Sequence, residues 1–275
     1  MFYAYSQESL SGGAGTPSIY HAYNDPALLS SFPAAALLFR QQHVAESTTR
    51  YVFAPDKALL FDRTISAATS VALRTASERG KLEIAIPRVP ELPWLKESVI
   101  PPGAQVFSDP QKSLIPVNAS EIVSDTHELI RNWDLGTFTI NTPRTQSAMG
   151  WIGGKAIVLP DISMEMTTRN GVVAVQSLDE LPIRQSRDIM ISIGARSVPA
   201  GPRSLPFYSE PMNGKLLITA PPALTLSGWD ARSGKMRRVS QPSYVDGHYV
   251  LNLDRSLPSE WLVLSAGPRR VTAIH

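Results

Sequence analysis

The feature that most constrains this fold is a long succession of short apolar runs between residues 81 and 275. Runs such as KAIVL, VVAVQSL and HYVLNL are separated by Gly, Pro, Asn and Asp, and several alternate apolar with polar residues. A period of two is typical of strands with one buried face, and turn signals at intervals of about 8 to 12 residues are typical of sandwiches and barrels. We therefore predict a mainly β protein whose residues 81–275 form an antiparallel β-sandwich of jelly-roll or immunoglobulin-like type.

A helix is predicted directly after Asn24, Asp25 and Pro26. An Asx side chain caps a first helical turn, and proline is preferred at the first helical position. An internal proline removes a hydrogen bond from the helix, so we expect this helix to restart around Ser31 and Pro33. The apolar residues that follow are expected to be buried; they are Leu37, Leu38 and Phe39.

The first 80 residues are predicted to form a strand, loop and helix segment that packs on the sandwich. TTRYVFA is a short strand, and a second helix is expected over residues 65–79 because Gly80 is a typical helix stop. We divide the chain into residues 1–80 and 81–275, which form either two domains or one compact unit.

Charge and residue usage exclude several classes of function. The net charge is +2 with the basic residues scattered, which disfavours nucleic acid as a partner. The chain has no cysteine, so disulfides, thiolate catalysis and sulfur-ligated metals are excluded. Its five histidines show no metal-ligand spacing. We predict no metal and no cofactor.

The beginning of the sequence has no basic region followed by an apolar run, and no stretch approaches about 18 apolar residues. We therefore expect no signal peptide and no membrane partner. The protein as given is expected to be soluble and cytoplasmic.

Three stretches resemble the C-terminal end of large bacterial glycoside hydrolases of the cellulase-like (β/α)8-barrel clan. YHAYNDPALLSSFPAAALLFRQQHV is similar to a last barrel strand, rim loop and helix; NWDLGTFTINTPRTQSAMGWIGG and VVAVQSLDELPIRQSRDIMISIGAR are similar to strand pairs of an appended β-sandwich. The resemblance implies a glycosidase that needs no metal and takes a carbohydrate as its partner. It covers at most the final barrel unit, so the clan's two catalytic carboxylates, which come from different barrel strands, cannot be assigned here.

The candidate catalytic residues are Glu8, Asp25 and His21, which lie among tyrosines near the start of the chain. Glycoside hydrolysis uses two carboxyl groups about 5 to 5.5 Å apart for retention and about 6.5 to 9.5 Å apart for inversion. Glu8 and Asp25 meet either requirement only if the loop between them folds back. The alternatives are that Asp25 is a helix cap, Glu8 a solvated loop residue and His21 a packing residue.

Aromatic faces and amide groups commonly bind sugar rings. On this ground we predict Tyr20, Tyr23 and Asn24 as substrate-binding residues at the rim of the same loop. Trp133 and Arg144 are predicted as a second binding surface on the sandwich. The alternative is that Trp133 belongs to the core and Arg144 ties a turn.

Three functions remain open from the sequence. The first is a small glycoside hydrolase, and the second is a non-catalytic carbohydrate-binding or structural β-sandwich module. The third is an esterase with a serine from the first loop, although no spacing specifically supports it. A homo-oligomer through the N-terminal helices is also expected, because exposed apolar helix surface tends to find a partner.

Overall fold

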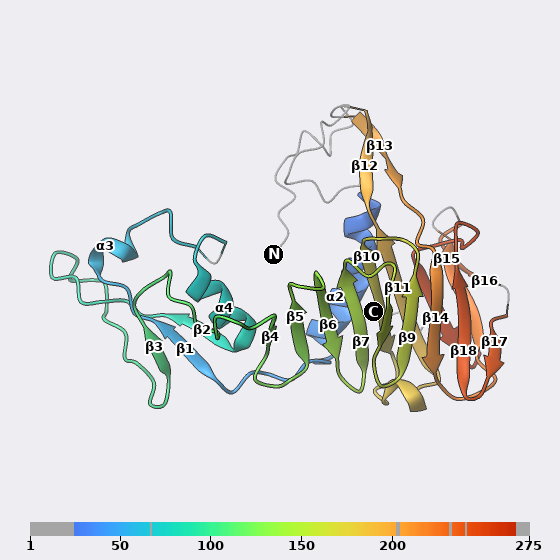
Figure 1. The fold of residues 1–275 in the computed structure, drawn as a ribbon, viewed down its shortest axis with the longest axis horizontal. Coiled ribbons are helices and arrows are strands. Elements are labelled where there is room, and N and C mark those ends of the chain that lie inside the picture. The colour runs from blue at the N-terminus through green and yellow to red at the C-terminus, as the bar shows by residue number, and fades with distance from the viewer. Residues whose placement is uncertain (1–24, 67, 202–203, 231–232, 240, 268–275) are drawn as a thin grey trace. The chain divides into compact units, whose positions relative to one another are not determined.

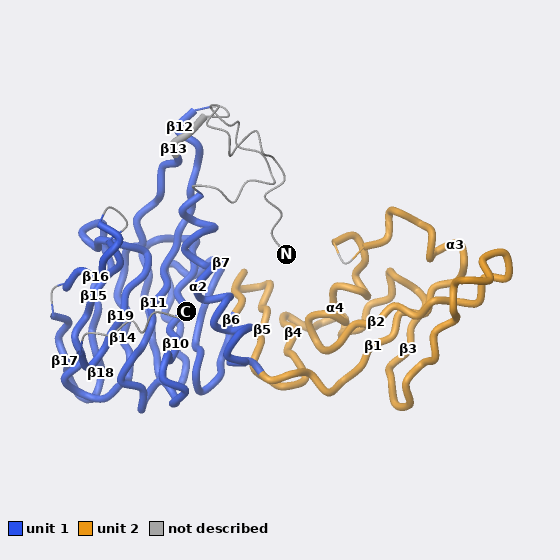
Figure 2. Tube along the Cα trace, turned by 180° about the vertical axis from the view of Figure 1, so that it is seen from behind, with its two compact units in different colours: residues 1–44, 139–275 blue, residues 45–138 orange. Residues whose placement is uncertain are grey.

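The computed structural model describes residues 25–66, 68–201, 204–230, 233–239 and 241–267 (Figure 1). The chain divides into two compact units, residues 1–44 with 139–275, and residues 45–138 (Figure 2). Neither junction coincides with the predicted boundary at residue 80. Strands on both sides of that boundary pair in one sheet, because β1 (Arg50–Phe53) runs parallel to β2 (Lys81–Ile84).

The first unit is an antiparallel β-sandwich, which confirms the predicted fold class. In its larger sheet the neighbouring strands follow the order β16-β15-β19-β11-β10-β7-β6. These strands are β6 (Thr137–Asn141), β7 (Thr145–Gly150), β10 (Gly171–Ser177), β11 (Asp188–Ala195), β15 (Thr225–Asp230), β16 (Lys235–Arg238) and β19 (Trp261–Ser265).

The second sheet has the order β17-β18-β14-β9-β8. Its strands are β8 (Ala156–Val158), β9 (Ile162–Met166), β14 (Gly214–Thr219), β17 (Ser243–Val245) and β18 (His248–Leu253). Two further strands, β12 (Ser197–Gly201) and β13 (Ser204–Ser209), pair with each other. A 3-10 turn, η1 (Ile183–Gln185), lies between β10 and β11.

The main core lies between the two sheets of the sandwich. Alternate residues of β11, among them Ile189 and Ile191, are fully buried, and so are Leu216 and Ile218 of β14. The period of two read from the sequence thus places one face of the central strands, such as β11 and β14, in the core.

Helix α2 (Pro26–Arg40) covers the outer face of β10 and β11. Gln176 donates from Nε2 to the Ala34 carbonyl at 3.1 Å, and Trp261 donates from Nε1 to the Ser30 carbonyl at 3.0 Å. Gly194 permits this close approach, since a Cβ atom at that position would lie 2.1 Å from Ser30 Oγ. Of the predicted N-terminal segment, helix α2 therefore packs on the sandwich, whereas β1 and α4 belong to the second unit.

Two details of the helix prediction were wrong. Helix α2 is continuous through Pro33 rather than restarted there. Its contacts with the sheet hold it, so the single hydrogen bond removed by the proline does not end it. Phe39 was expected to be buried but is 86% exposed, because the helix turns its small residues Ser30 and Ala34 toward the sheet.

The second unit is a small α/β arrangement. β1 lies between β2 and β3 (Gln105–Phe107) in a parallel sheet, and α4 (Val71–Arg79) packs on it through a cluster that includes Tyr51, Phe53 and Leu73. The unit also contains α3 (Lys57–Leu60) and the antiparallel pair β4 (Glu121–Val123) and β5 (Leu129–Asn132).

Candidate functional site

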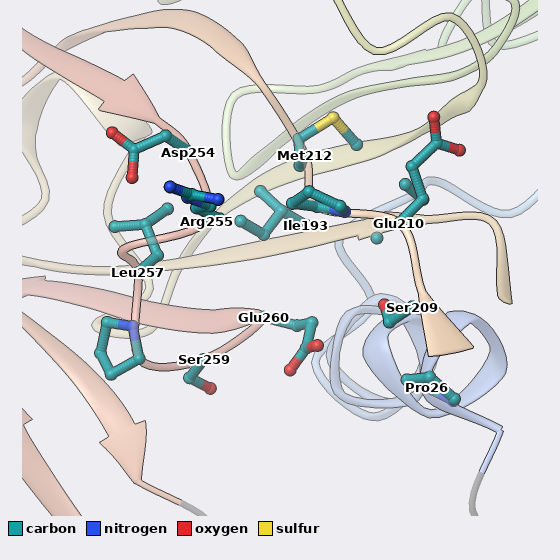
Figure 3. Close-up of a pocket in the computed structure, with 14 residues that line it drawn as sticks. Pro26, Ile193, Ser209, Glu210, Met212, Asp254, Arg255, Leu257, Ser259 and Glu260 are labelled. Carbon is teal, nitrogen blue, oxygen red and sulfur yellow. The ribbon is translucent and has the colours of Figure 1, made fainter. Parts of the chain in front are cut away.

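The best candidate site is a pocket of the first unit that is rich in carboxylates, and it is called the carboxylate pocket below (Figure 3). It has a volume of about 320 Å³ and lies where the first residue of α2, the end of β11 and the loop from β18 to β19 meet. Its acidic residues are Glu210, Asp254 and Glu260; its other polar side chains include Arg255, Ser209 and Ser259; its apolar side chains include Ile193, Met212 and Leu257.

Local hydrogen bonds shape the loop between β18 and β19. The Asp254 carboxylate accepts from the Ser256 backbone N–H at 2.7 Å, which is a typical Asx turn. The Glu260 carbonyl accepts from the Ile193 N–H at 2.9 Å, and this bond fixes the end of the loop against β11. The Asx turn at Asp254 and the backbone bond to Ile193 therefore hold Glu260 at the wall of the pocket.

The three carboxylates differ in their partners. Arg196 donates to the Glu210 carboxylate at 2.8 Å, and this contact raises the pKa of the Arg196 guanidinium. Hydrogen bonds from Ser256 lower the pKa of Asp254 below its ordinary value. Among the described residues, none forms a hydrogen bond or ion pair with the Glu260 carboxylate. Glu260 is thus the carboxylate of this pocket with both oxygens available to accept from a ligand, whereas Glu210 and Asp254 each already use one oxygen.

The carboxylates do not converge on one point. In Figure 3, those of Glu210 and Asp254 lie on opposite sides of the view, and that of Glu260 is directed away from both. A lowered pKa keeps Asp254 ionised, whereas a general acid needs a raised pKa. The arrangement offers separate acceptors for hydroxyl groups around an apolar floor.

Of the predicted catalytic residues, Asp25 lies in the described part of the chain, and Glu8 and His21 lie outside it. Asp25 is the N-cap of α2: its Oδ1 accepts from the Ala27 N–H at 3.1 Å and from the Ser197 hydroxyl. It precedes Pro26, which lines the carboxylate pocket. Tyr20, Tyr23 and Asn24 also lie outside the described residues, and their roles stay predictions.

Trp133 and Arg144 belong to different units and have structural partners. Trp133 follows β5, is 37% exposed, and lies with its ring centroid 5.5 Å from the Arg131 guanidinium carbon. Arg144 donates to the carbonyl oxygen of Gln41 at 3.1 Å and to its side-chain oxygen at 3.2 Å. This contact ties the end of α2 to the turn before β7.

Sequence reasoning missed Glu210, Asp254, Arg255 and Glu260. Each lies in a connection between strands, where charged and turn-forming residues are common, so no local pattern distinguishes them. Within the described ranges, no group of three or more histidine or acidic residues is arranged to hold a metal ion. No helix in those ranges is long and apolar enough to cross a membrane.

Comparison of the chain with models of protein families, with curated proteins and with solved structures finds no match.

Proposed function

We propose that this chain is a carbohydrate-binding β-sandwich protein and that the carboxylate pocket takes a neutral sugar unit. The observation that carries the proposal is the lining of this pocket, which combines acidic and hydroxyl-bearing residues with the apolar residues Ile193, Met212 and Leu257. Binding pockets for small molecules commonly combine an apolar surface with a few placed polar groups.

The chemistry of a sugar ring matches this lining. A pyranose presents C–H groups on its faces and hydroxyl groups at its edge, so the apolar floor packs against a face while carboxylates accept from the hydroxyls. Hydrogen bonds to ionised acceptors are about twice as strong as neutral ones. The same negative charges repel an acidic sugar, which is why a neutral unit is proposed.

Binding is favoured over hydrolysis, and hydrolysis is retained as the second candidate. The divergent carboxylates of Figure 3 and the lowered pKa of Asp254 support binding. The half-buried Glu260 carboxylate favours the second candidate, because a glycosidase requires a carboxyl group that faces its substrate. No described histidine lines the pocket, so the esterase has no support there.

The test compares the wild-type chain with Glu260→Gln and with the control Glu165→Gln. Glu165 is exposed on β9 and does not line the pocket, so its change removes a charge from the same unit without touching the site. Each protein is run in native gels that contain one neutral polysaccharide from a panel, and each is assayed with chromogenic aryl glycosides.

We expect at least one polysaccharide to retard the wild type and Glu165→Gln, and to retard Glu260→Gln less. Loss of one charged hydrogen bond predicts a Kd increase of about tenfold. Retardation that is equal in all three proteins would contradict the site, and absence of retardation throughout would contradict the function. Hydrolysis by the wild type that Glu260→Gln abolishes would replace binding with the second candidate.

A further inference from the structure

A second pocket of the sandwich unit lies near the other ends of β10 and β11 from the carboxylate pocket. It has a volume of about 430 Å³, and its walls include Pro143, Pro160 and Pro182, so it is called the proline pocket here. Its polar side chains include Gln146, Asp161 and Arg184.

The buried side chains of Asp161 and Gln146 line the proline pocket and are hydrogen-bonded to each other. Asp161 has a side chain that is 3% exposed, and it accepts from Gln146 Nε2 at 3.2 Å. Gln146 accepts in return from the Asp161 backbone N–H at 2.8 Å. Arg184 donates from Nε to Asp161 Oδ1 at 2.8 Å. The buried carboxylate therefore fixes the orientation of the guanidinium.

The backbone under Arg184 is also rigid. Ile183, the residue before it, is fully buried in the main core, and its N–H donates to the Pro143 carbonyl at 2.8 Å. The η1 turn is thus anchored on its inner side, and Arg184 and Gln185 are left exposed on its outer side.

Several hydrogen-bond donors of this pocket have no acceptor among the described residues. The Arg184 side chain is 55% exposed, and no described residue bonds to its two terminal nitrogens. The side-chain amides of Asn141 and Gln185, which line the pocket, likewise have no bonded partner among the described residues. A guanidinium held by a carboxylate at Nε still presents the N–H groups of its two terminal nitrogens to a planar oxyanion.

We propose that the proline pocket binds the carboxylate of an acidic sugar unit, and that the terminal N–H groups of the Arg184 guanidinium donate to this carboxylate. Because the Asp161 charge offsets part of the Arg184 charge, a singly charged carboxylate fits better than a doubly charged phosphate. Amide groups of Asn141 and Gln185 bond to ring hydroxyls, and proline rings pack against the C–H face. That the carboxylate is carried by a sugar rests on the proposed function; the carboxylate site itself does not.

The test uses NMR to follow the backbone amide signals and the arginine Nε–H signals while glucuronate, glucose, acetate or inorganic phosphate is added to the full chain. Glucuronate is expected to shift signals at Asn141, Arg184 and Gln185, and glucose is not. Acetate is expected to shift the same signals more weakly. Absence of a shift with both glucuronate and acetate, or a stronger response to phosphate, would overturn the carboxylate site. Equal responses to acetate and glucuronate would overturn the sugar assignment alone.

Arg184→Lys keeps a cation beside the buried Asp161, so the Asp161 charge is not left unpaired. The substitution removes the planar guanidinium. We expect the Kd for glucuronate to rise about tenfold in this variant. Arg238→Lys, an exposed arginine on β16 outside the pocket, is the matched control and should leave Kd unchanged. An unchanged Kd in Arg184→Lys would overturn the role of the guanidinium. Glu260→Gln should not alter glucuronate binding, so this result separates the proline pocket from the carboxylate pocket.

Discussion

Replacement of Gly194 by alanine tests how closely α2 must approach the sheet. The new Cβ atom would lie 2.1 Å from Ser30 Oγ and 3.1 Å from Ser30 Cβ. Ser30 is buried and Gly194 does not have a left-handed backbone, so the cost comes from packing rather than from backbone strain. Either the Ser30 hydroxyl or the helix itself has to move.

The magnitude follows from two opposing effects. Overpacking a close-packed interior costs about 1–3 kcal/mol. Removing a glycine from the unfolded chain stabilises the protein by about 0.4–1 kcal/mol. We therefore expect Gly194→Ala to lower the free energy of unfolding by about 1–2 kcal/mol.

Urea unfolding, followed by tryptophan fluorescence and circular dichroism, measures this change. Ser30→Ala removes the closer of the two contacts, and we expect a coupling of about 1 kcal/mol between the two substitutions in a double-mutant cycle. Gly267→Ala is the control, since nothing lies within 4 Å of a Cβ atom there. An unchanged free energy of unfolding in Gly194→Ala, or strictly additive effects, would refute the argument.

Two further predictions concern pH. Burial, and to a smaller extent the charge of Arg144, lower the pKa of His43 from 6.5 to about 4. As the pH falls, His43 is therefore protonated in the unfolded chain before it is protonated in the folded protein. The free energy of unfolding should therefore fall as the pH decreases from 6.5 toward 4, and His43→Gln should lack this part of the fall in urea titrations. Burial raises the pKa of Asp125, but hydrogen bonds from Thr49, Ser47 and Thr48 outweigh it and lower the pKa from 3.8 to about 2. Its stabilisation is full above pH 3.8 and is lost toward pH 2. Asp125→Asn should cost about 1 kcal/mol at neutral pH, as measured by thermal unfolding, and no change would contradict this assignment.

Local signals predicted most of the elements. Asp25 and Pro26 start α2, and Gly80 ends α4, since capping groups and helix stops act within one turn. The start of α4 was predicted at residue 65 but lies at Val71, where the Ser70 side chain caps the first turn by accepting from the Leu73 N–H. The Asn170–Gly171 dipeptide is typical of a tight hairpin between paired strands, yet β9 and β10, which flank it, belong to different sheets. The dipeptide allows the turn but cannot choose the partner strand, because pairing depends on the packing of both sheets.

The candidate sites were not predictable for a related reason. Glu210 and Glu260 lie in separate strand connections, and they line one pocket only because β11 places the two connections together. Gln146 and Asp161 lie 15 residues apart in the chain, and the hydrogen bonds between them in the proline pocket depend on the packing of separate strands.

The sequence alone determined the mainly β class, the helix start at Asp25 and the absence of cysteine chemistry, because each depends on composition or on neighbours within a few residues. Only the tertiary structure decided that β1 and β2 pair in a parallel sheet of their own. It also decided that Gly194 admits α2, and that carboxylates from separate loops share one pocket. These features depend on contacts between residues far apart in the chain, and a periodic pattern fixes which face of a strand is buried but not what covers it.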